Sequence, residues 1–204
     1  MSQRQTFTKA RPASSGFTLI EVLVSIAVLS IGLMGVAMLI GTTLATGTKA
    51  KFMSMANVLA SEKLDDLNKL SSNDPNMVAG GSLTGGATCA AGSIYCDTVT
   101  VNEASGADYE TETEVSGTPP TATTTTIVHT SAGCVGTPAT CGVAAPAGGG
   151  SSFTRRWLIT DSPTVTSAGG AVTITNARRV TVLVTLNNQS AANAVSFQMS
   201  MVRP

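Results

Sequence analysis

Residues 14–39 of this chain read SSGFTLIEVLVSIAVLSIGLMGVAML, and Glu21 stands there near the start of an otherwise uncharged apolar run from Phe17 to Ala45. As a helix this run would be about 43 Å long, against about 30 Å for the hydrocarbon core of a bilayer, so it can span a membrane with some tilt. A carboxylate at mid-helix costs about 2.5 to 3.5 kcal/mol on insertion scales. We therefore expect Glu21 to have a partner that offsets this cost.

The segment before the apolar run is basic. Residues 1–16 carry Arg4, Lys9 and Arg11, contain no acidic residue, and end in Ser-Ser-Gly. A secretory signal peptide has the opposite order, because its small-residue cleavage site follows a shorter apolar core. We therefore interpret this segment as a leader that is cut before the apolar run. Cleavage after the run, at residues 45–47, is the alternative.

These features resemble the type IV prepilins. Residues 16–21, Gly-Phe-Thr-Leu-Ile-Glu, match the processing motif of that family at every position. Within the family, the continuation of the apolar run and the later segment FTRRWLIT at residues 153–160 resemble the PilV-type minor pilins, also called type IV pilus modification proteins. The resemblance covers the leader and the long helix that is expected to follow it.

The resemblance implies that a prepilin peptidase cuts between Gly16 and Phe17 and methylates the new amino group of Phe17. Gly16 has no side chain, so the scissile bond can approach the protease closely. In this family the carboxylate that corresponds to Glu21 pairs with the amino terminus of a neighbouring subunit and sets the register of assembly. The alternative is that Glu21 lies close enough to the helix end to reach the lipid headgroups.

The resemblance also implies the partners and the location of the chain. The expected partners are the prepilin peptidase, other minor and major pilins, and the inner-membrane platform that assembles the pilus. The basic leader outweighs Lys49 and Lys51 beyond the run, which places the amino terminus in the cytoplasm. We therefore expect a single-pass protein of the inner membrane that moves to the periplasm and a cell-surface pilus.

Composition limits what the rest of the chain can be. The chain has 204 residues, of which 43% are hydrophobic and 12% are charged. Roughly 130 residues remain after the leader and the long helix, enough for one small domain. The leader holds three of the 12 basic residues and none of the 12 acidic ones, so the mature chain is slightly acidic. This balance, without a basic stripe that alternates with aromatic residues, argues against nucleic acid as a direct partner.

The pattern predicts four segments: the cleaved leader at 1–16, a transmembrane and filament-core helix at 17–45, an amphipathic continuation at 46–72, and a β-rich head at 73–204. Apolar residues recur at helical spacing as far as Leu70, and Pro75 then prevents continuation. The expected fold is α+β, a type IV pilin-like lollipop in which the long helix packs on an antiparallel sheet.

Alternating side chains predict the strands of the head. The clearest pair is 179–186 with 195–201, in which valine, leucine, phenylalanine and methionine occupy every second position. A third strand is expected at Phe153–Thr160, with Trp157 half-buried. Residues 80–150 are rich in Gly, Thr, Ala and Pro, so loops compete there with strands at 94–101, 109–115 and 121–129.

The four cysteines form two equally spaced pairs, Cys89 with Cys96 and Cys134 with Cys141. In an exported domain two local disulfides are the favoured interpretation, although three pairings are possible. Each bond would close a short loop and contribute a few kcal/mol. A tetrahedral zinc site is the alternative, but the spacing is long and the chain has one histidine.

Other candidate chemistry is weaker. Asp108, Glu110, Glu112 and Glu114 alternate along one expected strand, where a solvated acidic face or a protected edge strand is favoured over a site for a hard cation. His129 has no neighbouring motif for an activated nucleophile and is expected to be an ordinary loop or strand residue. No catalytic group, cofactor or metal site is therefore expected, and the chain is not expected to be an enzyme.

The arginine doublets at 155–156 and 178–179 should point their members to opposite faces of the sheet, where surface ion pairs are the expected role.

We therefore expect a minor pilin that primes the filament or joins it, with effects on adhesion and twitching motility. A type II secretion pseudopilin or a major pilin are the alternatives within the family. A membrane-tethered periplasmic binding domain is the alternative of another class.

Replacing Gly16 with glutamate is expected to block cleavage of the leader, because a bulky side chain would keep the scissile bond from the protease. Intact mass and amino-terminal sequencing of the protein from cells should show a mature chain that begins with methylated Phe17, and this product should be lost in the variant. A wild-type chain that begins near Met1, or one cut after residue 45, would contradict the prepilin interpretation.

Overall fold

The computed structural model describes residues 16–85, 88–90, 92–102, 107–116, 121–144, 150–187 and 194–204, with the side chains of residues 112–116 and 167 outside that description. The basic residues of the leader, Arg4, Lys9 and Arg11, lie outside the described residues. The chain divides into two compact units, Met1–Thr46 and Gly47–Pro204.

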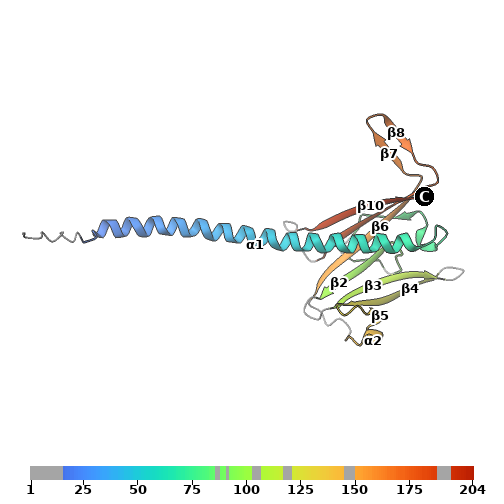
Figure 1. Cartoon of the computed structure of the whole chain (residues 1–204), viewed down its shortest axis with the longest axis horizontal. Helices are drawn as coiled ribbons and strands as arrows, with labels where there is room; N and C mark the ends of the chain where they lie inside the picture. The colour runs from blue at the N-terminus through green and yellow to red at the C-terminus, as the bar shows by residue number, and fades with distance from the viewer. Residues whose placement is uncertain are drawn as a thin grey trace, which may run out of the picture. The chain divides into compact units, whose positions relative to one another are not determined.

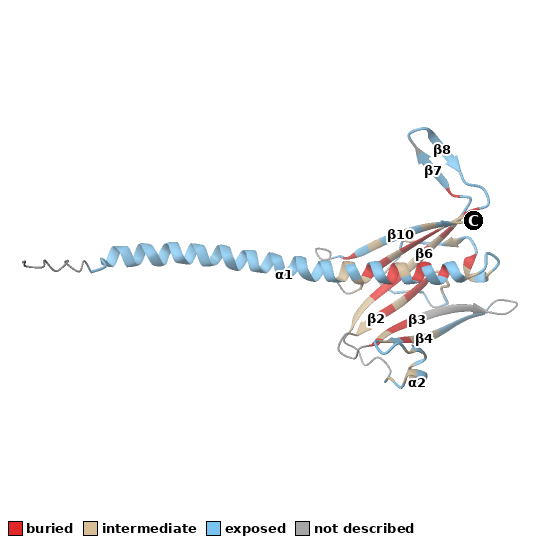
Figure 2. Ribbon diagram, viewed as in Figure 1, coloured by how far each residue is buried: buried red, intermediate tan, exposed pale blue. Residues whose placement is uncertain are grey.

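One long helix, α1, runs from Leu19 to Lys69 and contributes to both units (Figure 1). In the first unit every described residue is exposed, including large apolar side chains such as Leu29 and Met38 (Figure 2). By its length and composition, this helix is suited to crossing a membrane. In the second unit α1 buries one stripe, which consists of Ala56, Leu59, Ala60, Lys63, Leu64 and Leu67.

An antiparallel sheet forms the head, with its strands in the order β10-β9-β6-β2-β3-β4-β5 and with β1 pairing with β6. The central strands are β2 (Cys96–Asn102), β3 (Ala107–Ser116), β6 (Ser151–Asp161) and β9 (Arg178–Leu186). The outer strands are β1 (Gly80–Gly81), β4 (Thr121–Thr130), β5 (Val135–Gly136) and β10 (Ser196–Arg203). All pairings in this sheet are antiparallel.

Three smaller elements complete the head. A 3-10 turn, η1 (Pro75–Met77), follows α1, and a short helix, α2 (Pro138–Cys141), follows β5. A separate two-stranded hairpin, β7 (Thr164–Ser167) with β8 (Gly170–Thr173), lies between β6 and β9 in the chain.

The α+β fold with a long apolar amino-terminal helix and an antiparallel sheet confirms the expectation from sequence. The three segments of the Gly- and Thr-rich region for which loops were an alternative are strands, namely β2, β3 and β4. The main core lies between the buried stripe of α1 and one face of the sheet, where Phe153, Val180, Val182 and Val184 are fully covered.

Arginine side chains fix the end of α1. Arg203 on β10 donates from Nη1 to the carbonyl oxygens of Leu67 at 3.1 Å and Leu70 at 2.9 Å, which have no partner further along the helix. A cation at this end also interacts favourably with the helix dipole. Arg178 similarly reaches the carbonyl oxygen of Met77.

Disulfides join Cys89 to Cys96 and Cys134 to Cys141. These are the two local pairings that the sequence favoured. Cys96 is buried at the start of β2, so the first bond fastens the preceding loop to a central strand. The second holds α2 beside β5 and the small second core of Ala107, Tyr109 and Val128.

Candidate functional site

The bond that is predicted to be cut lies outside the helix. Gly16, Phe17 and Thr18 precede the first helical residue, and Phe17 is 80% exposed. A Cβ atom placed on Gly16 would meet no other atom of this chain within 4 Å. The fold of this chain therefore gives no steric reason for glycine at position 16, which agrees with a requirement set by a processing enzyme.

Thr18 caps the amino-terminal end of α1. Its side-chain oxygen accepts a hydrogen bond from the backbone N–H of Glu21 at 3.4 Å, and its carbonyl oxygen accepts one from Val22 at 3.3 Å. Thr-Leu-Ile-Glu has the threonine and glutamate spacing of a capping box, and an acid in the first turn suits the helix dipole. This capping role of Thr18 was not predicted from the sequence, although the spacing of Thr18 and Glu21 alone indicates it.

Polar side chains between residues 25 and 46 satisfy their hydrogen bonds inside the helix. Ser25 donates to the carbonyl oxygen of Glu21 at 2.7 Å, and the hydroxyls of Ser30, Thr42, Thr43 and Thr46 likewise donate to carbonyl oxygens three or four residues earlier. Such bonds remove the cost of placing hydroxyls in hydrocarbon. Among the described residues of this unit, Glu21 is the one ionisable side chain; it is exposed, and no described residue forms an ion pair with it.

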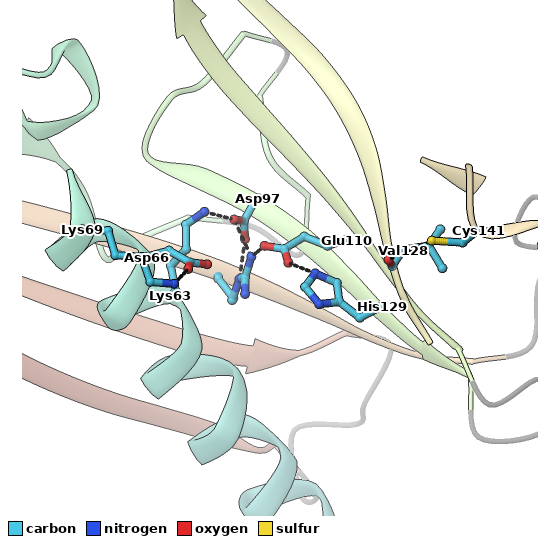
Figure 3. A network of polar contacts seen from close by, with 9 residues as sticks. Lys63, Asp66, Lys69, Asp97, Glu110, Val128, His129 and Cys141 are labelled. Atoms are coloured by element: carbon cyan, nitrogen blue, oxygen red, sulfur yellow. Dashed lines mark hydrogen bonds and ion pairs between the residues drawn. The ribbon is translucent and has the colours of Figure 1, made fainter. Parts of the chain in front are cut away.

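The head contains a second cluster of charges, which is buried between α1 and the sheet (Figure 3). Asp97 on β2 lies at its centre. Its carboxylate accepts two hydrogen bonds of 2.7 Å from Arg155 on β6 and forms an ion pair of 2.9 Å with Nζ of Lys63 on α1. The side chains of Asp97 and Arg155 are fully buried, and that of Lys63 is 8% exposed.

The cluster continues toward solvent along β3 and β4. Arg155 also pairs with Glu110, and Nε2 of His129 lies 3.5 Å from the other carboxylate oxygen of Glu110. The side chain of Glu110 is 8% exposed, whereas that of His129 is 45% exposed. Lys63 in addition lies over the ring of Trp157, 4.6 Å from its centroid. We call Lys63, Asp97, Glu110, Arg155 and Trp157 the buried charge cluster.

A groove of about 300 Å³ borders the buried charge cluster. Its lining includes Leu67 of α1, Leu70 directly after the helix, and Ile127, His129 and Val135 of the sheet. Glu110 and His129 thus stand at the margin between the buried cluster and solvent.

Electrostatic interactions hold Asp97 in its charged form. Burial alone would raise the pKa of this carboxyl group, but the nearby Arg155 guanidinium and Lys63 ammonium together outweigh burial, and the pKa is lowered from its ordinary value. Asp97 therefore remains a carboxylate although it has no contact with water.

The structure corrects three expectations about the head. Trp157 is 3% exposed and not half-buried, because α1 covers it and Lys63 lies over its ring. The acidic strand β3 is neither an edge nor a solvated face at Glu110, because it lies between β2 and β4 and Arg155 neutralises this carboxylate. The side chains of Glu112 and Glu114 lie outside the described residues.

The arginine doublets do point to opposite faces, but Arg155 is buried and is not a surface ion pair. Arg178, with Asp161 at 2.7 Å, has the expected exposed pairing. A signal for the buried charge cluster was present in the sequence, because Lys63, Asp97 and Arg155 occupy positions where the apolar period calls for a core residue. His129 was expected in a loop or a strand, and it lies on strand β4. Its side chain also contacts Glu110.

A protein family described as the prokaryotic N-terminal methylation motif matches residues 11–37 of this chain. The match supports a type IV prepilin-like protein that is processed by prepilin peptidase. No curated protein matches the chain, and no solved structure matches it. The cleavage site, the methylation of Phe17 and the assembly role of Glu21 remain predictions.

Replacing Asp97 with asparagine is expected to lower the free energy of unfolding by about 3 to 5 kcal/mol, because it leaves Arg155 and Lys63 buried with a single carboxylate between them. Denaturant unfolding of the full chain in detergent, followed by the fluorescence of the single tryptophan, measures this change. Asp161→Asn is the matched control, since its pair with Arg178 is partly exposed. It should cost less than about 1 kcal/mol. Equal losses in both variants would contradict the central role of Asp97.

Acid should remove the contribution of Asp97. Its pKa is lower in the folded protein than its ordinary value of about 3.9, so protons bind more readily to the unfolded chain. The contribution is complete above about pH 4 and is lost as the pH falls from there through the folded-state pKa. The difference in unfolding free energy between wild type and Asp97→Asn should therefore narrow below about pH 4. A difference that stays constant down to pH 2 would show that Asp97 is not the responsible group.

Proposed function

We propose that this chain is a minor pilin of the PilV type, which is cleaved by prepilin peptidase between Gly16 and Phe17 and then joins or primes a type IV pilus. The observation that carries the proposal is the setting of the Glu21 carboxylate on the apolar helix. Among the described residues of the first unit, Glu21 is the one ionisable side chain, on an exposed apolar stretch of α1 whose hydroxyls bond to their own backbone. A carboxylate in that setting calls for a cation from outside the chain.

Cleavage creates a suitable cation. The new amino group of Phe17 is largely protonated at neutral pH, and in a second subunit it approaches Glu21 when the two helices are staggered along their axes. The free energy of this pairing offsets the cost of holding Glu21 in the bilayer, so the subunit gains most when it leaves the lipid for the filament. An uncut chain lacks this amino group, which makes processing a precondition for assembly.

The apolar surface of α1 supports the proposed location. No described residue covers its exposed apolar side chains from Leu19 to Leu44, so they require lipid or other helices. The basic leader places the amino terminus in the cytoplasm and the head in the periplasm. Gly32, Gly35 and Gly41 have open space where a Cβ atom would lie, which suits close approach of a neighbouring helix.

The assignment to a minor pilin rests on the resemblance of the continuation of the apolar run and of FTRRWLIT to PilV-type proteins. In this chain the second segment lies within β6 and supplies both Arg155 and Trp157 to the buried charge cluster. The function is assembly and not turnover, and the effects on adhesion and twitching motility follow from the filament.

Replacing Glu21 with glutamine should leave cleavage intact but lower the amount of the protein in sheared pili at least tenfold, because the neutral side chain loses a charge-assisted pair worth about 1.5 to 3 kcal/mol. Quantitative mass spectrometry of pili and membranes measures both quantities. Glu62→Gln, the same change at an exposed position of the same helix, should leave both unchanged.

Abundance distinguishes the alternatives within the family. A minor pilin should be present in wild-type pili in far smaller amounts than the main subunit. A chain that is itself the main subunit of the pili would be a major pilin, and a processed chain that is absent from pili but required for protein secretion would be a pseudopilin. Either result would contradict the proposal.

A further inference from the structure

The β7–β8 hairpin has an apolar face that nothing in the described part of the chain covers. Val165 and Val172 lie opposite each other across the two strands, and Ile174 follows on the same face. These side chains are 48%, 62% and 38% exposed. The hydroxyls of Thr164 and Thr173 lie 3.0 Å apart on the other face.

The hairpin packs mainly on itself. The two strands form a sheet separate from that of the head, and Figure 2 shows them exposed and standing away from it. An isolated two-stranded hairpin is marginally stable in water, and a third strand or a packed face stabilises it. A further strand would therefore stabilise the β7–β8 hairpin. No described strand outside the hairpin pairs with either of its outer edges.

The outer edge of β10 offers that strand, because β10 ends the sheet and no described strand pairs with its far side. The Leu186 N–H donates to the carbonyl oxygen of Val195, so by antiparallel alternation the backbone groups of Gln198 and Ser200 face away from β9. The one charged residue of β10, Arg203, is occupied at the end of α1. This edge thus lacks the charges, proline or bulge that usually prevent pairing.

The core of the head is incomplete beside this edge. On β9, Val180, Val182 and Val184 are fully buried, whereas their partners on β10, Met201, Met199 and Phe197, are only partly buried. An added strand with apolar side chains on the α1 side would cover these three residues. The face formed by Val165, Val172 and Ile174 has this character.

The other long edge fits the hairpin less well. It is the part of β4 that precedes the pairing with β5, and residues 121–126 there read Thr-Ala-Thr-Thr-Thr-Thr. Those polar side chains leave no row of half-covered apolar residues.

The hairpin and the C-terminal end of β10 lie at one end of the sheet. Arg203 pairs in register with Arg178, where β9 begins after the hairpin. Two copies that stand side by side in the same direction would therefore bring the hairpin of one to the level of β10 in the other (Figure 1).

We propose that the β7–β8 hairpin of one copy adds to the outer edge of β10 in a second copy of this chain. The inference rests on one part of the proposed function, which is that the amino-terminal helix anchors each copy in the membrane in the same direction. The contact joins two different surfaces, so it leaves a hairpin free on one copy and a β10 edge free on the other, and further copies can add.

Photocross-linking of the full chain in membranes tests the contact. A photoreactive residue replaces Gln198 on β10, and cells supply one unlabelled and one isotope-labelled copy. Mass spectrometry should then find cross-links from position 198 to residues 164–174 that combine the two labels. Cross-links within one copy only, cross-links to β4, or no cross-links to the hairpin would overturn the proposal.

Two variants test the chemistry of the contact. Val165→Thr with Val172→Thr keeps the shape of the hairpin but makes its face polar, and should lower the mixed-label cross-links about tenfold. Val135→Thr, the same change at a side chain that is 65% exposed on β5, should not change them. Ser200→Pro removes an outward N–H and should also lower them, whereas Ser200→Ala should not. An unchanged yield in the double threonine variant would overturn the proposal.

Two separate measurements distinguish a failure of this contact from a failure of the proposed function. The mass of the amino-terminal peptide in the same sample reports processing, and the cross-links report the contact. A mature chain that begins at Phe17 without hairpin cross-links overturns the contact alone. An uncut chain overturns the proposed function whether or not the cross-links form. The fluorescence of Trp157 verifies that each variant head is folded.

Discussion

The carboxylate of Asp97 is the group around which the head is organised. It accepts two hydrogen bonds from Arg155 of β6 and pairs with Lys63 of α1, so one buried anion joins the helix to two central strands. A buried ion pair is not by itself a large source of stability, because burial costs both ions their hydration. It also favours one position of the helix, since shifting α1 by one turn would leave Lys63 buried without its carboxylate partner, while Asp97 and Arg155 on the paired strands β2 and β6 would stay together.

Glu21 and Asp97 are two carboxylates of one chain in opposite settings. Asp97 has its cations within the head, and they hold it charged. Glu21 has no ion-pair partner among the described residues and stands on a helix whose apolar surface is also uncovered. The head thus supplies the counter-charges of its own buried carboxylate, whereas the carboxylate and the apolar side chains of the first unit have no cover among the described residues. Within the head, the β7–β8 hairpin and the edge of β10 also carry apolar side chains that the described residues leave wholly or partly uncovered.

Sequence patterns predicted where the helix and the strands lie better than they predicted which polar side chains are buried. Alternation located β9, β10 and β6 because each has one apolar face, but it gave β2, β3 and β4 only as alternatives to loops because these strands have many small and polar residues. It did not indicate that Glu110 is buried, since an acid on an alternating strand looks the same whether it faces water or an arginine. The β7–β8 hairpin was missed because its strands have four residues each and lie in a polar, glycine-containing segment.

The sequence by itself determined the processing motif, the apolar helix and the class of fold, because these depend on residues that are neighbours in the chain or recur with a helical or strand period. The local disulfides follow from the same proximity. Only the tertiary structure decided that Lys63, Asp97, Glu110 and Arg155 form one cluster, since these residues come from α1, β2, β3 and β6. The reason is that the energy of a charge depends on what surrounds it, and residues far apart in the chain supply those surroundings.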